Sequence, residues 1–108
     1  MSTIAASLTH FEFTTSSYGM SKAALNFAAL QLNVELKDKG FTIIALHPGA
    51  VSTKGVLDAA EKLGYREYFL ANSITTEVST TGIVKLVEGL KHEDSGKFID
   101  YKGDLLPL

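Results

Sequence analysis

Tyr18 and Lys22 are the two residues of this 108-residue chain whose types and spacing could support proton transfer. They are four residues apart, so on a helix they would share a face. An ammonium group close to a phenol favours the phenolate and lowers the phenol pKa from its usual value of about 10. Such a tyrosine can exchange a proton with a carbonyl or alcohol oxygen. The spacing alone is weak evidence. In a chain with four tyrosines, a lysine stands four residues after at least one of them by chance in about one chain in five.

The composition sets the broad class of the protein. The chain is 45% hydrophobic and 20% charged, with a formal net charge of -2, so we expect one globular domain over residues 1–108. This weak acidity gives no electrostatic reason to expect a nucleic acid or an anionic membrane as partner. Cysteine is absent, which excludes a disulfide framework and a thiolate nucleophile. The amino terminus has no basic leader, and no apolar run approaches about 20 residues. We therefore expect a soluble, cytoplasmic protein.

A long helix is predicted from about residue 16 to residue 40, and it would carry Tyr18 and Lys22 in its first turns. Ser16 and Ser17 offer N-cap hydroxyls, and Gly40 stands where a left-handed glycine would end the helix. The apolar residues in between recur with helical spacing and form a stripe that we expect to be buried. This stripe consists of Leu25, Ala28, Ala29, Leu32 and Leu36.

The remaining pattern predicts an α/β fold. Residues 41–46 and 96–101 are short runs typical of strands, and the first is apolar enough to be covered on both faces. We expect a lobe with short helical pieces at about residues 54–71. A second helix is expected from about residue 76, although Gly82 and Gly89 each weaken it by about 1 kcal/mol. Its apolar stripe consists of Ile83, Leu86, Val87 and Leu90. With a first strand near the amino terminus, this order implies a doubly wound parallel sheet of about three strands with crossover helices.

Other residues with chemically active side chains have plainer interpretations. The three histidines, His10, His47 and His92, lack metal-ligand spacing and cysteine partners, so we predict no metal site. The aromatic cluster at residues 65–69 (YREYF) could line a substrate cleft, but we favour local packing as its role.

Two stretches of sequence resemble motifs of the short-chain dehydrogenase/reductase family. Residues 18–25, YGMSKAAL, resemble its Tyr-x-x-x-Lys motif, with the family's serine before the lysine and alanines after it. Residues 47–53, HPGAVST, resemble its Pro-Gly-x-Val-x-Thr loop at the expected distance. Residues 96–107 are similar to the last strand and tail of small carbonyl-reducing members, many of them fungal. The resemblance covers essentially the whole chain but only the second half of the family's usual length. It implies a partial Rossmann-like sheet whose amino-terminal half is missing.

The resemblance also implies an enzyme, an NAD(P)-dependent oxidoreductase that reduces a small carbonyl substrate or oxidises an alcohol. It makes Tyr18 the general acid/base and Lys22 the group that binds the nicotinamide ribose hydroxyls. The backbone of Val51 and the side chain of Thr53 would hold the nicotinamide carboxamide. The Pro48-Gly49 turn would lie beneath the ring, where glycine lets the backbone approach a ligand closely. Without the Tyr18 context, this turn is an ordinary end of a strand.

The family further uses a serine hydroxyl that binds the substrate oxygen, usually 13 residues before the tyrosine. That offset falls on Ala5, so a neighbouring residue must supply the hydroxyl. Residues 2–7, STIAAS, resemble the family's pair of serines at a strand end, followed by a longer loop. This places the hydroxyl at Ser2 or Thr3, with Ser7 as a third choice, and Ser2 is our prediction. The alternative is that these hydroxyls only cap local structure.

The adenine side of a dinucleotide site has no counterpart in the chain. Its nine glycines form no phosphate-binding fingerprint, and no acidic residue is placed to bind an adenine ribose. The resemblance implies NADP as the cofactor, with NAD as an alternative because the discriminating residues belong to the missing half. A micromolar dissociation constant corresponds to a binding free energy of about 8 kcal/mol. Little of this free energy remains without the pyrophosphate and adenosine contacts. We therefore expect that the isolated chain neither binds NADPH well nor turns over.

Two hypotheses of different classes follow. In the first, the chain is part of an oxidoreductase of this family. In the second, it is a shortened, non-catalytic descendant that acts only as an association module. The family often dimerises through the long helix, so self-association through this helix is expected by resemblance. A Thr-Gly-x-x-x-Gly-x-Gly stretch upstream in the same reading frame would support the first hypothesis, and a stop codon just ahead of Met1 the second.

Overall fold

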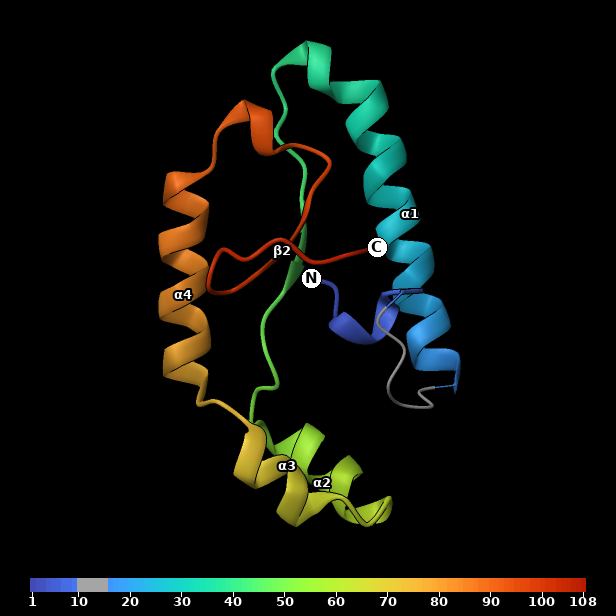
Figure 1. The fold of residues 1–108 in the computed structure, drawn as a ribbon, viewed down its shortest axis with the longest axis vertical. Helices are drawn as coiled ribbons and strands as arrows, with labels where there is room; N and C mark the ends of the chain where they lie inside the picture. The colour runs from blue at the N-terminus through green and yellow to red at the C-terminus, as the bar shows by residue number, and fades with distance from the viewer. Residues whose placement is uncertain (10–15) are drawn as a thin grey trace.

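A computed structural model describes residues 1–9 and 16–108 and has an α/β fold. Two long helices, α1 (Ser16–Leu36) and α4 (Thr76–Gly89), lie on opposite sides of a parallel pair of strands, β1 (Ala45–His47) and β2 (Phe98–Asp100) (Figure 1). A helical hairpin of α2 (Lys54–Lys62) and α3 (Arg66–Asn72) projects from one end. Three 3₁₀ turns complete the described elements: η1 (Ile4–Ala6), η2 (Lys37–Lys39) and η3 (His92–Asp94). The partial doubly wound arrangement is as predicted from the sequence.

The long helix has the predicted extent with small differences at its ends. Ser16 and Ser17 lie within the first turn of α1 instead of preceding it, and the residues before them lie outside the described part of the chain. At the other end, α1 continues through η2 to Gly40, which has a φ of 85°. The predicted left-handed glycine is therefore confirmed.

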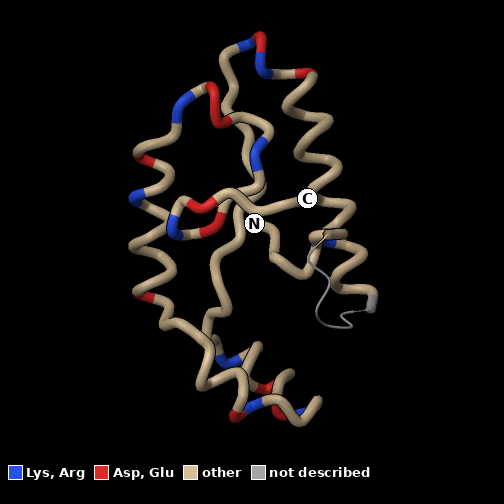
Figure 2. Tube along the Cα trace, viewed as in Figure 1, with Lys and Arg blue, Asp and Glu red and all other residues tan. Residues whose placement is uncertain are grey.

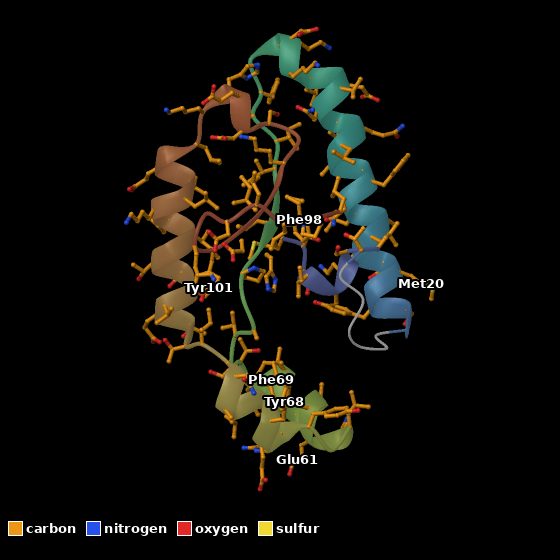
Figure 3. The ribbon with its side chains drawn as sticks, in the orientation of Figure 1. Met20, Glu61, Tyr68, Phe69, Phe98 and Tyr101 are labelled. Atoms are coloured by element: carbon orange, nitrogen blue, oxygen red, sulfur yellow. The ribbon has the colours of Figure 1, made fainter. Side chains whose placement is uncertain are left out.

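The apolar stripe predicted on α1 is buried only in part, since Ala29 and Leu36 are half-buried and the rest is exposed. Leu25 and Leu32 of the predicted stripe are 42% and 46% exposed, whereas the neighbouring Asn26 is only 4% exposed. No charged residue occurs at positions 23–34, so the helix is uncharged all the way round over this length (Figure 2). Apolar spacing cannot select one face when several faces are apolar. The labelled side chain of Met20 points away from the body of the molecule (Figure 3) and is 69% exposed.

The described residues contain two strands instead of the expected three. The predicted first strand is replaced by η1, and the amino terminus contributes one sheet-like hydrogen bond, from the Ser2 N–H to the Leu46 carbonyl, of 2.6 Å. The strands are also shorter than residues 41–46 and 96–101. Before β1, the Ile43 N–H bonds the Ser95 hydroxyl, and the Ile43 carbonyl bonds the Gly96 N–H. These bonds join the two segments ahead of the regular ladder between β1 and β2.

The core of the fold is the sheet itself. Phe98 and Ile99 of β2 are 2% and 4% exposed, and Ala45 and Leu46 of β1 are also buried. Figure 3 shows Phe98 between the strands and α1. A buried apolar pair of strands fits the predicted sheet covered on both faces.

Helix α4 begins at Thr76 as predicted, and its stripe is partly confirmed. Ile83, Leu86 and Leu90 are half-buried, but Val87 is 54% exposed. Position 82 requires a glycine, because a Cβ there would lie 2.5 Å from the Tyr101 carbonyl oxygen. The glycine that weakens the isolated helix thus allows α4 to pack closely on the segment after β2.

The predicted lobe consists of α2 and α3, which confirms the short helical pieces. The packing expected for its aromatic cluster is found in part. Phe69 is half-buried, but Tyr65 and Tyr68 are each 59% exposed. Within the described residues, no helix combines the length and the apolarity needed to cross a membrane.

Candidate active site

Tyr18 and Lys22 share a face in the first turns of α1, as their spacing predicts. The Lys22 Nζ lies 6.0 Å from the centre of the Tyr18 ring, within the range in which a cation and an aromatic face attract each other. The Tyr18 side chain is 53% exposed, so its phenol is accessible to a ligand.

A backbone carbonyl orients the lysine side chain. The Lys22 Nζ donates a hydrogen bond of 3.3 Å to the Met1 carbonyl oxygen. This bond ties the amino-terminal segment to the helix that carries the phenol. The ammonium group has further N–H donors, which it can offer to a ligand beside Tyr18.

Asn26 continues the same face one turn further along α1. The Ser2 hydroxyl donates a hydrogen bond of 2.5 Å to the Asn26 Oδ1, and both side chains are buried. The Asn26 Nδ2 has no hydrogen-bond partner among the described residues. Asn26 was not singled out from the sequence, although its spacing of four from Lys22 and eight from Tyr18 places it on the chemically active face.

The three hydroxyls considered for the substrate oxygen, those of Ser2, Thr3 and Ser7, have different surroundings. The Ser2 side chain is 5% exposed and its hydrogen is used in the bond to Asn26. Ser7 is 2% exposed, and its hydroxyl lies 3.2 Å from that of Thr9. Thr3 is half-buried, and its Oγ1 accepts the Ala5 N–H at 3.3 Å as the N-cap of η1. An accepting hydroxyl such as that of Thr3 keeps its own hydrogen for donation.

His47, at the end of β1, lies against the same turn. Its Nδ1 accepts the Ile4 N–H at 3.3 Å, which requires that nitrogen to be unprotonated. Burial lowers the pKa of His47, and the negative charge of Asp100, its partner across the two strands, opposes this in part. The buried Asp100 carboxylate accepts the N–H groups of Lys102 and Asp104 at 2.9 Å each.

The Pro48-Gly49 turn ends β1 as predicted, and the structure adds a packing reason for the glycine. Gly49 has a φ of 89°, and a Cβ there would lie 2.6 Å from the Ile74 Cδ1 and 2.9 Å from the Tyr101 ring. The close approach is therefore to the protein's own side chains. The Pro48 carbonyl accepts the Ser79 hydroxyl at 2.6 Å, which ties the turn to α4.

Val51 and Thr53 lie just before the start of α2. Val51 pairs with Ile74 as an isolated parallel bridge. Thr53 is the N-cap of α2, and its Oγ1 accepts the Val56 N–H at 3.4 Å. Thr53 is exposed, and its hydroxyl hydrogen is available to a ligand at the positive end of the helix dipole.

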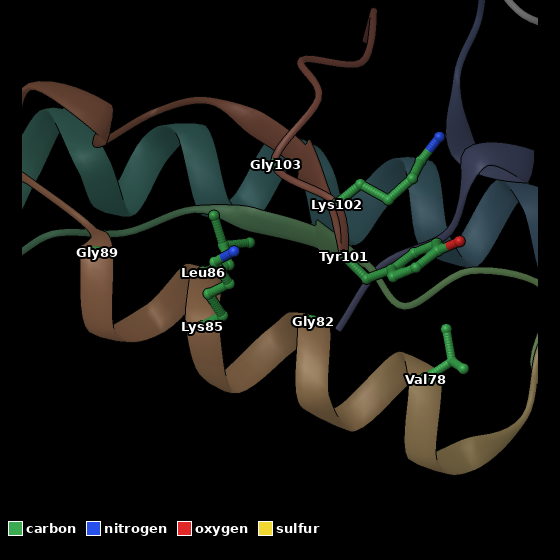
Figure 4. A pocket seen from close by; sticks show the side chains of 8 residues that line it. All are labelled: Val78, Gly82, Lys85, Leu86, Gly89, Tyr101, Lys102 and Gly103. Atoms are coloured by element: carbon green, nitrogen blue, oxygen red, sulfur yellow. The ribbon is translucent and has the colours of Figure 1, made fainter.

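These groups lie on the side of the sheet toward which β1 runs. Helix α1 runs opposite to β1, so its first turns and the segment after β1 point toward the same end of the sheet (Figure 1). A cavity of about 420 Å³ lies elsewhere, between α4 and the turn after β2 (Figure 4), and contains none of the predicted site residues. No cluster that could hold a metal ion occurs in the described ranges 1–9 and 16–108. The arrangement therefore provides a phenol, an ammonium group and hydroxyls, the equipment for proton transfer at an oxygen atom.

Comparisons with known proteins find relatives that are named as oxidoreductases or dehydrogenases. No family model matches the chain. An uncharacterised oxidoreductase of Schizosaccharomyces pombe is 37% identical over 103 residues, covering 91% of this chain and 41% of the relative. A short chain dehydrogenase of Penicillium aethiopicum is 39% identical over 94 residues, covering 84% of this chain and 36% of the relative.

Solved structures give the same result for the fold. The carbonyl reductase Sniffer of D. melanogaster superposes with a TM-score of 0.83 at 28% identity, over 100% of this chain and 39% of that protein. The NADPH-bound carbonyl reductase from chicken fatty liver superposes with a TM-score of 0.82 at 27% identity, over 99% of this chain and 40% of that protein.

The chain therefore has an α/β fold and is similar to proteins named as oxidoreductases, dehydrogenases and carbonyl reductases. The chain is a relative of the short-chain dehydrogenases/reductases, corresponds to their carboxy-terminal part, and spans about 40% of the length of the proteins it matches.

Proposed function

We propose that this chain forms the nicotinamide side of an NAD(P)H-dependent carbonyl reductase, with Tyr18 as the general acid/base. The observation that carries the proposal is the Lys22 ammonium 6.0 Å from the exposed Tyr18 ring, on a chain related to short-chain dehydrogenases. The chicken relative is described as NADPH-bound, which favours NADP over NAD.

The residues present fit a nicotinamide group. The exposed Tyr18 and the remaining donors of Lys22 can bind ribose hydroxyls, and the Thr53 hydroxyl with the Val51 backbone can bind a carboxamide. When bound, the nicotinamide ring supplies a hydride to the carbonyl carbon. The Tyr18 phenol gives its proton to the carbonyl oxygen, which becomes an alcohol, and the phenolate left behind regains a proton from water. The Lys22 charge stabilises that phenolate.

We assign the substrate-binding hydroxyl to Thr3. Its Oγ1 is half-buried on η1, the turn that packs against the start of α1. A hydrogen bond from this hydroxyl to the substrate oxygen would stabilise the negative charge that develops there before proton transfer. The substrate proposed is a small carbonyl compound or, in the reverse direction, an alcohol.

The isolated chain should bind the nicotinamide half of the cofactor but not the adenosine half, and a binding experiment with each half tests the proposal. In saturation-transfer NMR with the isolated chain, reduced nicotinamide mononucleotide should give a signal with a dissociation constant on the order of 1 mM, about 4 kcal/mol of binding. Adenosine 2′,5′-bisphosphate should give none, because the chain has no glycine-rich phosphate-binding turn. A signal from the adenosine compound alone would contradict the proposal.

One observation favours a second function, association. Helix α1 exposes large apolar side chains one heptad apart, namely Met20 at 69%, Phe27 at 63% and Val34 at 69%. Exposed apolar side chains in a row are typical of interaction surfaces. Sedimentation velocity tests this, since a chain that acts only by association should self-associate through α1 and give no nicotinamide signal in the experiment above.

A further inference from the structure

The amino-terminal segment at residues 2–4 is fixed at both ends by side chains that the proposed mechanism does not use. On one side of Thr3, Ser2 donates its hydroxyl hydrogen to Asn26 at 2.5 Å and its N–H to the Leu46 carbonyl at 2.6 Å. On the other side, the Ile4 N–H bonds the His47 Nδ1 at 3.3 Å.

We propose that Asn26 and His47 are positioning residues, which together hold residues 2–4 so that the Thr3 hydroxyl keeps a fixed place relative to Tyr18. This inference rests on the proposed function, because the position of Thr3 matters only if Tyr18 and Thr3 bind the same substrate oxygen. Neither residue touches that oxygen in this scheme.

Asn26 fixes the segment to the catalytic helix. It lies eight residues after Tyr18, so both belong to one face of a rigid helix. The amide is 4% exposed, and its Nδ2 has no partner within the described part of the chain. A buried donor without a partner lowers stability, so the Asn26 amide has a cost as well as a benefit for the fold. The interaction that the amide does make is with Ser2, next to Thr3.

His47 fixes the segment to the sheet. Its imidazole accepts the Ile4 N–H only while Nδ1 is unprotonated. Asp100 on β2 is the charged group that acts on the imidazole, and Lys102 lies 3.8 Å from the Asp100 carboxylate. From the other side, η1 brings only a backbone N–H and no charged side chain. Protonation of His47 should therefore release Ile4.

Amide hydrogen exchange on the isolated chain tests both contacts. For His47, the protection of the Ile4 N–H should fall at least about fivefold between pH 7.5 and pH 5, after correction for intrinsic exchange. In His47→Phe it should be low at both pH values. In His47→Gln, whose amide oxygen can accept the same bond at any pH, it should stay high at both.

For Asn26, the variant Asn26→Leu should lower the protection of the Ser2 N–H at least about fivefold, and Asn26→Asp, which keeps an acceptor, should restore it. If Asn26→Leu does not fold, the pH series on the unaltered chain still decides the His47 arm, and Asn26→Ala replaces the leucine variant. The inference is overturned if Ile4 protection is independent of pH and of His47→Phe, or if Ser2 protection does not respond to Asn26.

Ligand binding to the same variants distinguishes a failure of this inference from a failure of the proposed function. Addition of reduced nicotinamide mononucleotide should shift the Tyr18 and Lys22 amide resonances in the His47→Gln and Asn26→Asp variants as in the unaltered chain. Loss of those shifts everywhere, with the exchange results as expected, would refute the proposed function and leave the two contacts as architecture. Retained shifts with unchanged exchange would refute only the positioning role.

Discussion

The Ser2 hydroxyl and the Asn26 side-chain oxygen are 2.5 Å apart in a buried contact between the amino-terminal segment and α1. This relationship underlies our proposal that Thr3, and not Ser2, offers its hydroxyl to a substrate. A hydroxyl that uses its hydrogen to bond a buried amide acts as a structural bridge, whereas the neighbouring Thr3 keeps its hydrogen.

The Ser2 bridge should be visible in stability. Ser2→Ala leaves the buried Asn26 amide without its remaining partner and should lower the free energy of unfolding by about 1–3 kcal/mol. Thr3→Ala removes only the cap of a three-residue turn and should cost less than about 1 kcal/mol. Urea denaturation of the two variants measures the difference, and equal losses would argue against the bridge.

Lys22 should control the response to the nicotinamide group. Lys22→Met keeps the helix and most of the side-chain volume but removes the ammonium beside Tyr18, so the saturation-transfer signal of reduced nicotinamide mononucleotide should fall at least about tenfold, or about 1.4 kcal/mol. Lys39→Met, in η2 beyond the far end of α1, is the matched control and should leave the signal unchanged. Equal effects of the two variants would show that only general charge matters.

Alanine substitutions at Gly40 and Gly49 should distinguish the stability cost of a left-handed backbone conformation from the cost of crowding. Gly40 and Gly49 both have positive φ, 85° and 89°, but of the two only Gly49 has side chains within 4 Å of the place that a Cβ would occupy. Gly40→Ala should cost about 1–2 kcal/mol from its conformation alone. Gly49→Ala should cost at least about 1 kcal/mol more, because Ile74 and Tyr101 must move. Thermal unfolding followed by circular dichroism compares them, and a smaller loss at Gly49 would contradict the tight turn.

His47 should make stability depend on pH. Burial lowers its pKa in the folded chain, so the unfolded chain takes up the proton first as the pH falls below about 6.5. Stability from the neutral imidazole is therefore fully present at pH 7.5 and is lost progressively toward pH 5. His47→Gln should flatten this part of the profile. The matched control is His92→Gln, which removes a histidine from an exposed position. Urea midpoints at pH 7.5 and 5.5 test it, and an identical loss in all three proteins would exclude His47 as the cause.

Local signals in the sequence were enough to predict much of the fold. The capping glycine at residue 40, the start of α4 at Thr76 and the shared face of Tyr18 and Lys22 all depend on neighbours within a few residues. The strands at residues 41–46 and 96–101 were placed correctly, but their lengths depend on hydrogen bonds between Ile43 and residues 95–96, far away in sequence.

What sequence reasoning missed depends on contacts across the fold. The buried face of α1 could not be selected by apolar spacing, because the face that packs inward carries Asn26 while Leu25 and Leu32 stay exposed. The sequence also could not show that the Ser2 hydroxyl bonds Asn26, which is why our proposal moves the substrate-binding role from Ser2 to Thr3. The role of His47 likewise required the position of the Ile4 N–H.

The most direct test of the central claim is a map of chemical-shift changes in the amide resonances of the isolated chain as NADPH is added to millimolar concentration. The account predicts weak binding, with a dissociation constant above about 10 µM, and changes concentrated at Tyr18, Lys22 and residues 49–53. Lys22→Met should reduce them. Tight binding below about 10 µM, or changes that avoid Tyr18 and Lys22, would contradict the assignment of this face to the nicotinamide group.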